Sequence, residues 1–211
     1  MKQFVSIFMT LLFTGALQAE EVKTIKLNTP DKTRGKALMQ ALADRHSDRE
    51  FSTRELSLQD LSDLLWAANG INRQDGKRTA PSALNKQEVD IYVIRKDGAY
   101  LYRADTHSLQ LIATGDHRAA VAGAQSFAAE APVSLVLVAD ISRFGDDSER
   151  TRTMAAVDAG IVCQNINLFC AAVGLSTVPR ASMDHATLRK VLKLKESQLL
   201  LMNNPVGYPK K

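Results

Sequence analysis

Residues 151 to 173 read TRTMAAVDAGIVCQNINLFCAAV, and Gly174 follows them directly. Nearly every position in this stretch is apolar or small, so the pattern predicts one long helix that ends at the glycine. A helix that is apolar almost all the way round has to be covered on most sides. The stretch therefore predicts the central helix of a core, or of an interface between two copies of the chain.

The two cysteines of the chain, Cys163 and Cys170, both fall within this helix. Seven residues correspond to about 10.5 Å along a helix axis. Cα atoms joined by a disulfide lie within roughly 7 Å of each other, so these thiols are not expected to pair. Their apolar neighbours predict buried free thiols that fill space, rather than a redox pair or metal ligands.

The segments around this helix predict a sheet. Residues 133 to 139 form a continuous β-branched and Leu-rich run, typical of a strand buried on both faces. Asp97-Gly98 predicts a tight turn between two further strands. The expected strands are 89–94, 100–102, 109–113, 133–139 and 198–202, and the expected helices are 34–45, 58–69, 117–127, 151–173 and a short one after Asp184.

Two of the shorter helices carry clear local signals. Leu38, Ala41 and Leu42 recur at helical spacing, which predicts the first of these helices. Ser57 with Asp60 predicts a helix start, and Asn69-Gly70 predicts its end. The order of elements predicts an α+β sandwich, with a mixed, mostly antiparallel sheet flanked by helices.

The N-terminus has the features of a secretory signal. Lys2 precedes an apolar run from Phe4 to Leu17, and small residues stand near its end. We expect residues 1–19 to be a cleaved signal for export to a bacterial periplasm, with cleavage after Ala16 and an uncleaved anchor as alternatives. No membrane span should remain after cleavage, residues 20–33 are expected to form an N-terminal arm, and residues 34–211 a single domain.

The charge of the chain does not suggest a nucleic-acid partner. The formal net charge of the whole chain is +4, and the excess is spread along the sequence. No basic run is interleaved with aromatic residues, so nothing predicts nucleic-acid binding. A mild positive excess is compatible with an anionic cofactor.

Arg45, Ser47 and Arg49 form the first candidate binding motif. If this segment is extended, its alternate side chains point the same way. One arginine could then grip a phosphate while the second reaches another polar group. Taken alone, the pattern favours a solvated helix end over a binding site.

Three further motifs occupy loops or element ends. Pro81-Ser82-Ala83-Leu84-Asn85 precedes a strand, and its small and amide side chains could line the edge of a flat heterocycle. The other two are Gly174 to Pro179, after the long helix, and Pro205 to Pro209, near the end. An ordinary turn is the alternative for the first of these.

In this order and spacing, the four motifs resemble the nitroreductase superfamily. The segments 65–70, 78–82 and 205–207 look most like its SagB-type dehydrogenases and their small stand-alone relatives, and the resemblance spans roughly residues 35 to 209. It implies an FMN-binding homodimer with two sites at the interface. It also implies a flavin-dependent oxidoreductase that transfers hydride or electrons through flavin N5, in ping-pong order, to a small organic acceptor.

The resemblance also implies roles for individual residues. Arg45 matches the FMN phosphate ligand, Ser47 its polar partner, and Arg49 the cation at the flavin pyrimidine edge; His46 lies within the same motif. The loop that the partner subunit lays against the flavin matches Pro81, Ser82, Ala83 and Asn85. Pro179, Arg180, Ala181 and Ser182 match the backbone near N5, and Lys210 or Lys211 a last phosphate cation.

The sequence departs from the family in places, and this leaves alternatives open. Ala181-Ser182 stands where relatives often carry Glu-Gly, so the backbone donor to N5 needs testing. The histidines lack ligand spacing, so no metal is expected, and no catalytic triad is visible. Because NAD(P)H is not expected outside the cytoplasm, an exported flavin-binding redox module without NAD(P)H turnover is the rival hypothesis. A scaffold that no longer binds flavin is a third.

Overall fold

The structure is a computed structural model that describes residues 23–210, so the expected signal at 1–19 and Lys211 lie outside the described residues. Its centre is a seven-stranded sheet with the order β1-β4-β3-β2-β5-β7-β6. The strands are β1 (Thr24–Lys26), β2 (Val89–Arg95), β3 (Gly98–Arg103), β4 (Ser108–Thr114), β5 (Val133–Asp140), β6 (Ser176–Thr177) and β7 (Gln198–Gly207). Every strand pairing among the described residues is antiparallel, so the expectation of a mixed sheet was wrong in that detail.

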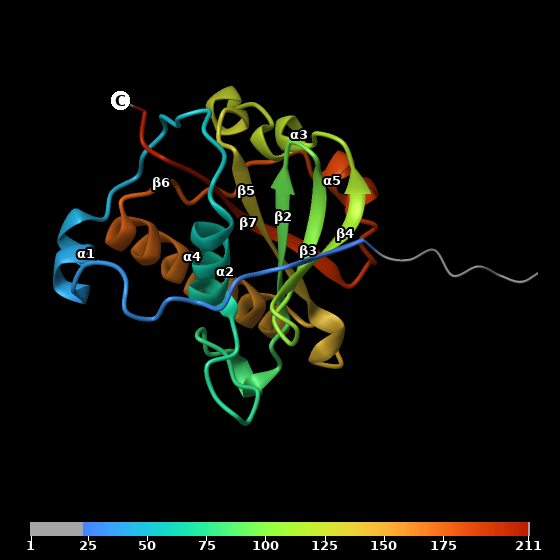
Figure 1. Ribbon diagram of the computed structural model, residues 1–211. Coiled ribbons are helices and arrows are strands. Elements are labelled where there is room, and N and C mark those ends of the chain that lie inside the picture. The colour runs from blue at the N-terminus through green and yellow to red at the C-terminus, as the bar shows by residue number, and fades with distance from the viewer. Residues whose placement is uncertain (1–22, 211) are drawn as a thin grey trace, which may run out of the picture.

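Helices cover both faces of the sheet (Figure 1). They are α1 (Leu38–Asp44), α2 (Leu58–Asn69), α3 (Arg118–Ala122), α4 (Glu149–Val173) and α5 (His185–Val191). Successive residues of β5 serve opposite cores: Leu135 and Leu137 pack with α2 and α4, and Val136 and Val138 pack with α3 and α5. The period-2 alternation of a strand makes this possible, and it confirms that this strand is buried on both faces.

The long helix α4 begins and ends as its sequence indicates. Ser148 caps its first turn by accepting a hydrogen bond from the Thr151 N–H, and Gly174 closes it with φ of 75°. That left-handed conformation strains any residue with a Cβ, which is why glycine stands there. Both cysteines are buried free thiols, as predicted. Burial raises the pKa of Cys163 to about 11 and also raises that of Cys170, so neither is a ready nucleophile.

The predicted ends of two shorter helices are also confirmed. Ser57 accepts a hydrogen bond from the Asp60 N–H at the start of α2, and Gly70 caps its end. Asp184 caps α5 by accepting a hydrogen bond from the Thr187 N–H. These features depend only on residues within one helical turn, so the sequence reveals them.

Several boundaries differ from expectation. The supposed arm at 20–33 contains β1, which pairs with β4 at the sheet edge, and a strand so short carries no readable period. The helix expected at 117–127 is the short α3 followed by a 3-10 helix at Ser126–Ala129. The last strand continues to Gly207 through Pro205. A proline is tolerated there because β6 pairs with β7 only at the next two residues.

The first helix differs most. It spans seven residues, not the twelve of 34–45, and of its three regularly spaced apolar residues only Ala41 is buried. Leu38 is 64% exposed, Leu42 45% and Met39 76% in the single chain. The apolar residues of α1 follow the expected helical spacing, but most of them do not pack into the core of this chain.

Candidate functional site

The first motif is an extended segment anchored to the end of α4. Arg45 ends α1 with extended backbone angles. The Asp48 N–H donates to the Thr177 carbonyl at 2.9 Å, and the Ser176 hydroxyl donates to the Asp48 carboxylate at 2.5 Å. Asp48 thus fastens the segment to β6, while the residues alternating with it are left for other partners.

Those alternating residues are available to a ligand. Arg45 is half-buried, and Ser47 and Arg49 are exposed. Within residues 23–210 none of these three side chains forms a hydrogen bond or ion pair. The ring nitrogen Nδ1 of His46 instead bonds the Asp44 carbonyl at 2.7 Å. Two unpaired guanidiniums on a fixed strand-like segment suit an anion.

The C-terminal motif lies beside this segment. Phe51 and Pro209 form an antiparallel bridge, and the Ser52 N–H donates to the Tyr208 carbonyl at 2.8 Å. A cleft of about 720 Å³ opens here, and Lys210 lines it. The remaining lining residues are Phe51, Ser52, Thr53, Arg54, Gly174, Tyr208 and Pro209.

Tyr208 locks the C-terminal segment in place. Its hydroxyl donates to Asp60 Oδ2, and the Arg54 guanidinium lies 3.5 Å from its ring centroid. Burial raises the pKa of Asp60, but hydrogen bonds from Tyr208, Ser57 and Arg34 outweigh burial and hold that pKa below its ordinary value. Asp60 therefore stays ionised and keeps Tyr208 attached to the first turn of α2.

The segment that follows the third motif pairs antiparallel with β7 at Arg180, and this arginine is structural. Arg180 exchanges backbone hydrogen bonds with Asn203 at 2.9 and 2.7 Å. Its guanidinium is buried and donates to Asn203 Oδ1 at 2.7 Å, to the Gln125 side chain at 2.8 Å and to the carbonyls of Val121 and Ala122. Neither its side chain nor its N–H is left for a cofactor; Pro179 beside it is half-buried.

Ala181 and Ser182 differ from Arg180 in this respect. Both residues are exposed, and their N–H groups make no hydrogen bond within residues 23–210. The Ser182 carbonyl accepts from the Asn203 side-chain amide at 3.1 Å, which holds the segment in place. The backbone donor in doubt from the sequence is therefore free in the structure.

The second motif forms a tight 3-10 turn over Ala83–Asn85. The Ser82 hydroxyl accepts a hydrogen bond from the Gln87 N–H at 2.8 Å, and the Ala83 N–H donates to Asp158 Oδ2 at 2.7 Å. Pro81 and Asn85 are exposed, and Ser82 and Ala83 are half-buried. Leu84 is 85% exposed, so the turn presents a large apolar side chain outward.

This turn lies far from the other three motifs within one chain. It is tied to α4 at Asp158, whereas the stretch leading into α1 is tied to α4 by a hydrogen bond from the Lys36 N–H to the Ala172 carbonyl. At 1.5 Å per residue, those two points of the helix are about 21 Å apart. Figure 1 shows α1 at one side and the loop that follows α2 at the lower end. A single chain therefore does not bring all four motifs together.

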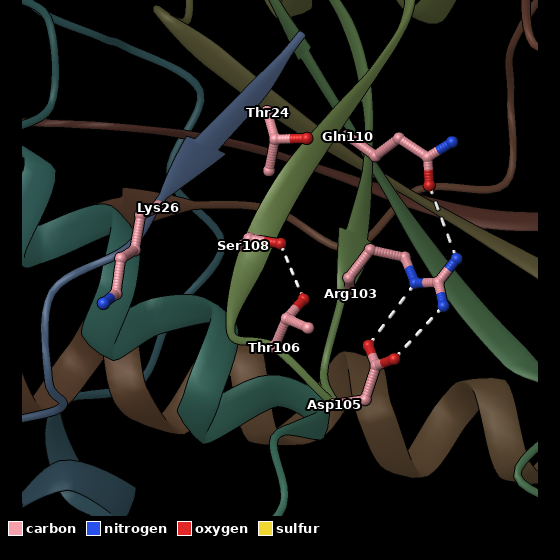
Figure 2. A pocket seen from close by; sticks show the side chains of 7 residues that line it. All are labelled: Thr24, Lys26, Arg103, Asp105, Thr106, Ser108 and Gln110. Atoms are coloured by element: carbon pink, nitrogen blue, oxygen red, sulfur yellow. Dashed lines mark hydrogen bonds and ion pairs between the residues drawn. The ribbon is translucent and has the colours of Figure 1, made fainter. Parts of the chain in front are cut away.

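A second depression, of about 560 Å³, lies over the β1–β4 edge (Figure 2). Arg103 there bonds to Asp105 and Gln110, and Thr106 bonds to Ser108 at 2.8 Å. These side chains largely satisfy one another, and no residue of the four motifs lines the depression. We assign no chemistry to it.

Sequence reasoning overlooked Glu88, Asp158 and Arg54. Asp158 is the one acidic residue of the 151–173 stretch, and that isolated charge was the available signal. Glu88 and Arg54 carry no comparable signal, since their neighbours are settled by tertiary contacts. In the described part of the chain, no group of three or more acidic, His or Cys side chains could hold a metal ion. Helix α4 is long and apolar enough to span a membrane, a test that core helices of soluble proteins also pass.

Comparison with known proteins gives a consistent result. The family model described as "Nitroreductase family" matches residues 42–208. A candidate nitroreductase of Methanocaldococcus jannaschii is 35% identical over 197 residues, covering 87% of this chain and 96% of that protein.

Solved structures agree. The crystal structure of a candidate nitroreductase from Ralstonia eutropha JMP134 is 36% identical, with a TM-score of 0.83, and the match covers 89% of this chain and 90% of that one. A candidate nitroreductase from Anabaena variabilis is 17% identical, with a TM-score of 0.76 and coverage of 96% and 45%. The second likeness concerns the fold alone.

Proposed function

Because the chain belongs to the nitroreductase family of flavin-dependent oxidoreductases, we propose that it binds FMN and works as a homodimer with two sites at the interface. The observation that carries the proposal is the meeting of three motifs at the C-terminal end of α4. There, the segment 45–49, the strand β6 with the residues after it, and the C-terminal segment are joined by hydrogen bonds. The SagB-type subclass remains a prediction.

The phosphate end of the cofactor fits the unpaired cations. Arg45, Arg49 and Lys210 form no ion pair within the described residues. A guanidinium binds phosphate through paired N–H groups, which suits Arg45. Lys210 on the neighbouring cleft would add a second positive charge. Arg49 would lie at the pyrimidine edge, where a cation stabilises the charge of the reduced ring.

The N5 end fits the segment after Arg180. The free N–H groups of Ala181 and Ser182 are the donors that this chain offers there. Arg180 contributes indirectly, because its buried guanidinium fixes the segment against β7 and α3. When bound, FMN would supply two-electron transfer, taking hydride from a donor and passing electrons to a small organic acceptor in ping-pong order.

A homodimer would account for two features of the single chain: its exposed apolar side chains and the separation of its site motifs. The exposed apolar side chains Leu38, Met39 and Leu42 belong to α1, and Val157 and Leu84 lie near the opposite end of α4. If the two-fold axis crosses α4 near its middle, each end of the helix faces the opposite end of the partner's copy. The Pro81–Asn85 turn of one subunit would then reach the Arg45–Arg49 segment of the other. Both the apolar surface and the divided site would be completed together.

The N-terminal signal predicted from the sequence favours a periplasmic location for this chemistry. A flavin-binding redox module without NAD(P)H turnover is the second candidate, favoured by that export. Cell fractionation of the full-length chain tests the location. Stopped-flow reduction of the purified protein by NAD(P)H and by other hydride donors, followed by reoxidation, separates enzyme from module.

The central experiment is the identification of the bound cofactor and the assembly state. The mature protein should carry a flavin spectrum, release FMN on denaturation, and run as a dimer in light scattering. FAD as the released species, or a flavin-bound monomer at micromolar concentration, would contradict the proposal. Colourless protein that FMN does not titrate would support the scaffold instead.

A further inference from the structure

Glu88 is a buried acid without a donor to stabilise its charge. The residue is 0% exposed, and neither carboxyl oxygen accepts a hydrogen bond from any group in residues 23–210. It directly precedes β2, so its backbone is fixed by the sheet. A carboxylate buried in this way is strongly disfavoured unless it is paired or protonated.

The neighbour of Glu88 is a second buried acid. Asp158 of α4 is 5% exposed, and its Oδ2 accepts the hydrogen bond from the Ala83 N–H at 2.7 Å. Burial first, and then hydrogen bonding to Asp158, raise the pKa of Glu88 to about 7. Around neutral pH, Glu88 can therefore donate a proton to an oxygen of Asp158 while Asp158 still accepts from the loop.

The surrounding charges do not neutralise a doubly ionised pair. Arg143 is the cation that acts on Glu88, but its guanidinium donates to the Gln87 carbonyl and to Asp90 Oδ2. Arg78 donates its Nε to the Gln87 side chain. The gap beneath the loop measures about 10 Å³, at the lower limit for one water molecule. A shared proton is then the simplest way to keep both acids buried.

The loop held by this pair is under strain. Leu84, Asn85 and Gln87 have φ of 52°, 53° and 50°, in the left-handed region that side chains avoid. Such conformations persist only where surrounding contacts impose them. The bond from Ala83 to Asp158 is the tie between this turn and α4.

We propose that Glu88 and Asp158 share one proton and act as positioning residues for the Pro81–Asn85 turn, so that loss of the proton loosens the turn. The proposal rests on the proposed function, in which this turn completes the partner subunit's cofactor site. Cofactor affinity would then fall when both acids are ionised. Below neutral pH the protonated Glu88 holds Asp158 in place, and above it the two like charges push Asp158 away from Ala83.

The first arm of the test needs no cofactor chemistry. Amide hydrogen exchange of Ala83 is measured on the full chain as purified, at about pH 6 and about pH 8.5, with the intrinsic pH dependence of exchange removed. We expect protection to fall at least about tenfold between the two conditions in the wild type. Glu88→Gln should abolish the fall, because a neutral amide donates at both pH values. Glu196→Gln, at an exposed acid, should leave it unchanged.

Variants of Asp158 provide a second test, which remains usable if Glu88→Gln does not fold. Asp158→Ala should lower Ala83 protection at both pH values. Asp158→Asn should restore it and remove its pH dependence, because the amide oxygen still accepts from Ala83 and no longer repels Glu88. Protection that is independent of pH in the wild type, or unaffected by Asp158→Ala, would overturn the pair.

The second arm titrates the same proteins with FMN. The dissociation constants of the wild type and of Glu196→Gln should rise about tenfold over the same pH interval, whereas the Glu88→Gln constant should stay level. Absence of FMN binding at either pH would refute the proposed function, while the exchange arm would still decide the carboxyl pair. FMN affinity that does not follow Ala83 protection would refute the link between the turn and the site.

Discussion

Arg180 and Asn203 are joined three times: by two backbone hydrogen bonds and by a 2.7 Å bond from the guanidinium to the Asn203 side-chain oxygen. The same guanidinium holds the carbonyls of Val121 and Ala122, so one side chain connects α3, β7 and the segment that carries Ala181 and Ser182. Burial lowers the pKa of Arg180, yet an arginine stays charged at any ordinary pH. The segment is positioned by a buried cation whose charge is balanced by carbonyl dipoles.

Removing the Arg180 side chain should lower the stability of the folded chain, because Arg180 is expected to position the segment and not to take part in electron transfer. Arg180→Ala leaves three buried acceptors, the Val121 and Ala122 carbonyls and Asn203 Oδ1, without their donor, and we expect a loss of about 3 kcal/mol in the free energy of unfolding. Urea denaturation of the purified chain measures it. Arg103→Ala, which removes an exposed ion pair, should cost less than about 1 kcal/mol. Equal losses in the two variants would show that Arg180 is not the anchor described here.

Substitution of Arg45 and substitution of Arg49 should have different effects in a redox titration of the bound flavin. Arg49→Ala should weaken reduced FMN more than oxidised FMN and lower the midpoint potential by tens of millivolts, since about 30 mV corresponds to 1.4 kcal/mol for two electrons. Arg45→Ala should weaken both forms equally, because the charge of the phosphate does not follow the redox state of the ring. Spectroelectrochemical titration compares the variants. If the midpoint potential shifts in Arg45→Ala and not in Arg49→Ala, the roles assigned to the two arginines are wrong.

Leu84 tests the interface. Since its side chain is 85% exposed in the single chain, Leu84→Ser should change the stability of the folded subunit by less than about 0.5 kcal/mol. In the proposed homodimer the same change should raise the dissociation constant of the dimer at least about tenfold. Sedimentation over a dilution series measures the constant. Leu84→Met keeps an apolar side chain and should remain dimeric; an intact Leu84→Ser dimer would place the interface elsewhere.

Glu88 predicts the direction of a stability change with pH. Its pKa rises from 4.5 to about 7 on folding. Between these values the native state binds more protons than the unfolded state, so stability falls as pH rises and levels off above about 7. Urea unfolding near pH 5 and pH 8 should show a decline, on the order of 3 kcal/mol, that Glu88→Gln lacks. Parallel profiles for the two proteins would contradict the assignment.

Tyr208 has the opposite pH signature. Tyr208→Phe removes a hydrogen bond to an ionised Asp60 and should cost about 1.5 kcal/mol near neutral pH. The pKa of Asp60 is lowered in the folded chain, so its stabilising bonds are present above 3.8 and are lost as the pH falls through the folded-state value. The difference between the variant and the wild type should therefore shrink in acid. Chemical unfolding across acidic pH measures the difference, and one that persists would mean that Tyr208 acts through packing alone.

Much of the fold could be predicted from the sequence, because its signals are local. Ser57, Asp184 and Gly174 mark helix ends through bonds or angles within one turn. The burial of β5 on both faces follows from a continuous apolar run. The sequence also provided candidate site residues, and the resemblance of their motifs to a family predicted the fold. Each of these signals depends on residues that are close together in the sequence, so distant segments do not change it.

Only tertiary structure decided which of those residues are free to act. Arg45 and Arg180 look alike in the sequence, yet one guanidinium is unpaired and the other is buried among carbonyls of α3. Glu88 and Asp158 are 70 positions apart by number, and only packing makes them neighbours. Pairing and burial depend on distant segments whose contacts leave no period in the local sequence. For the same reason, the sequence showed that α1 has an apolar face but not that this chain leaves it uncovered.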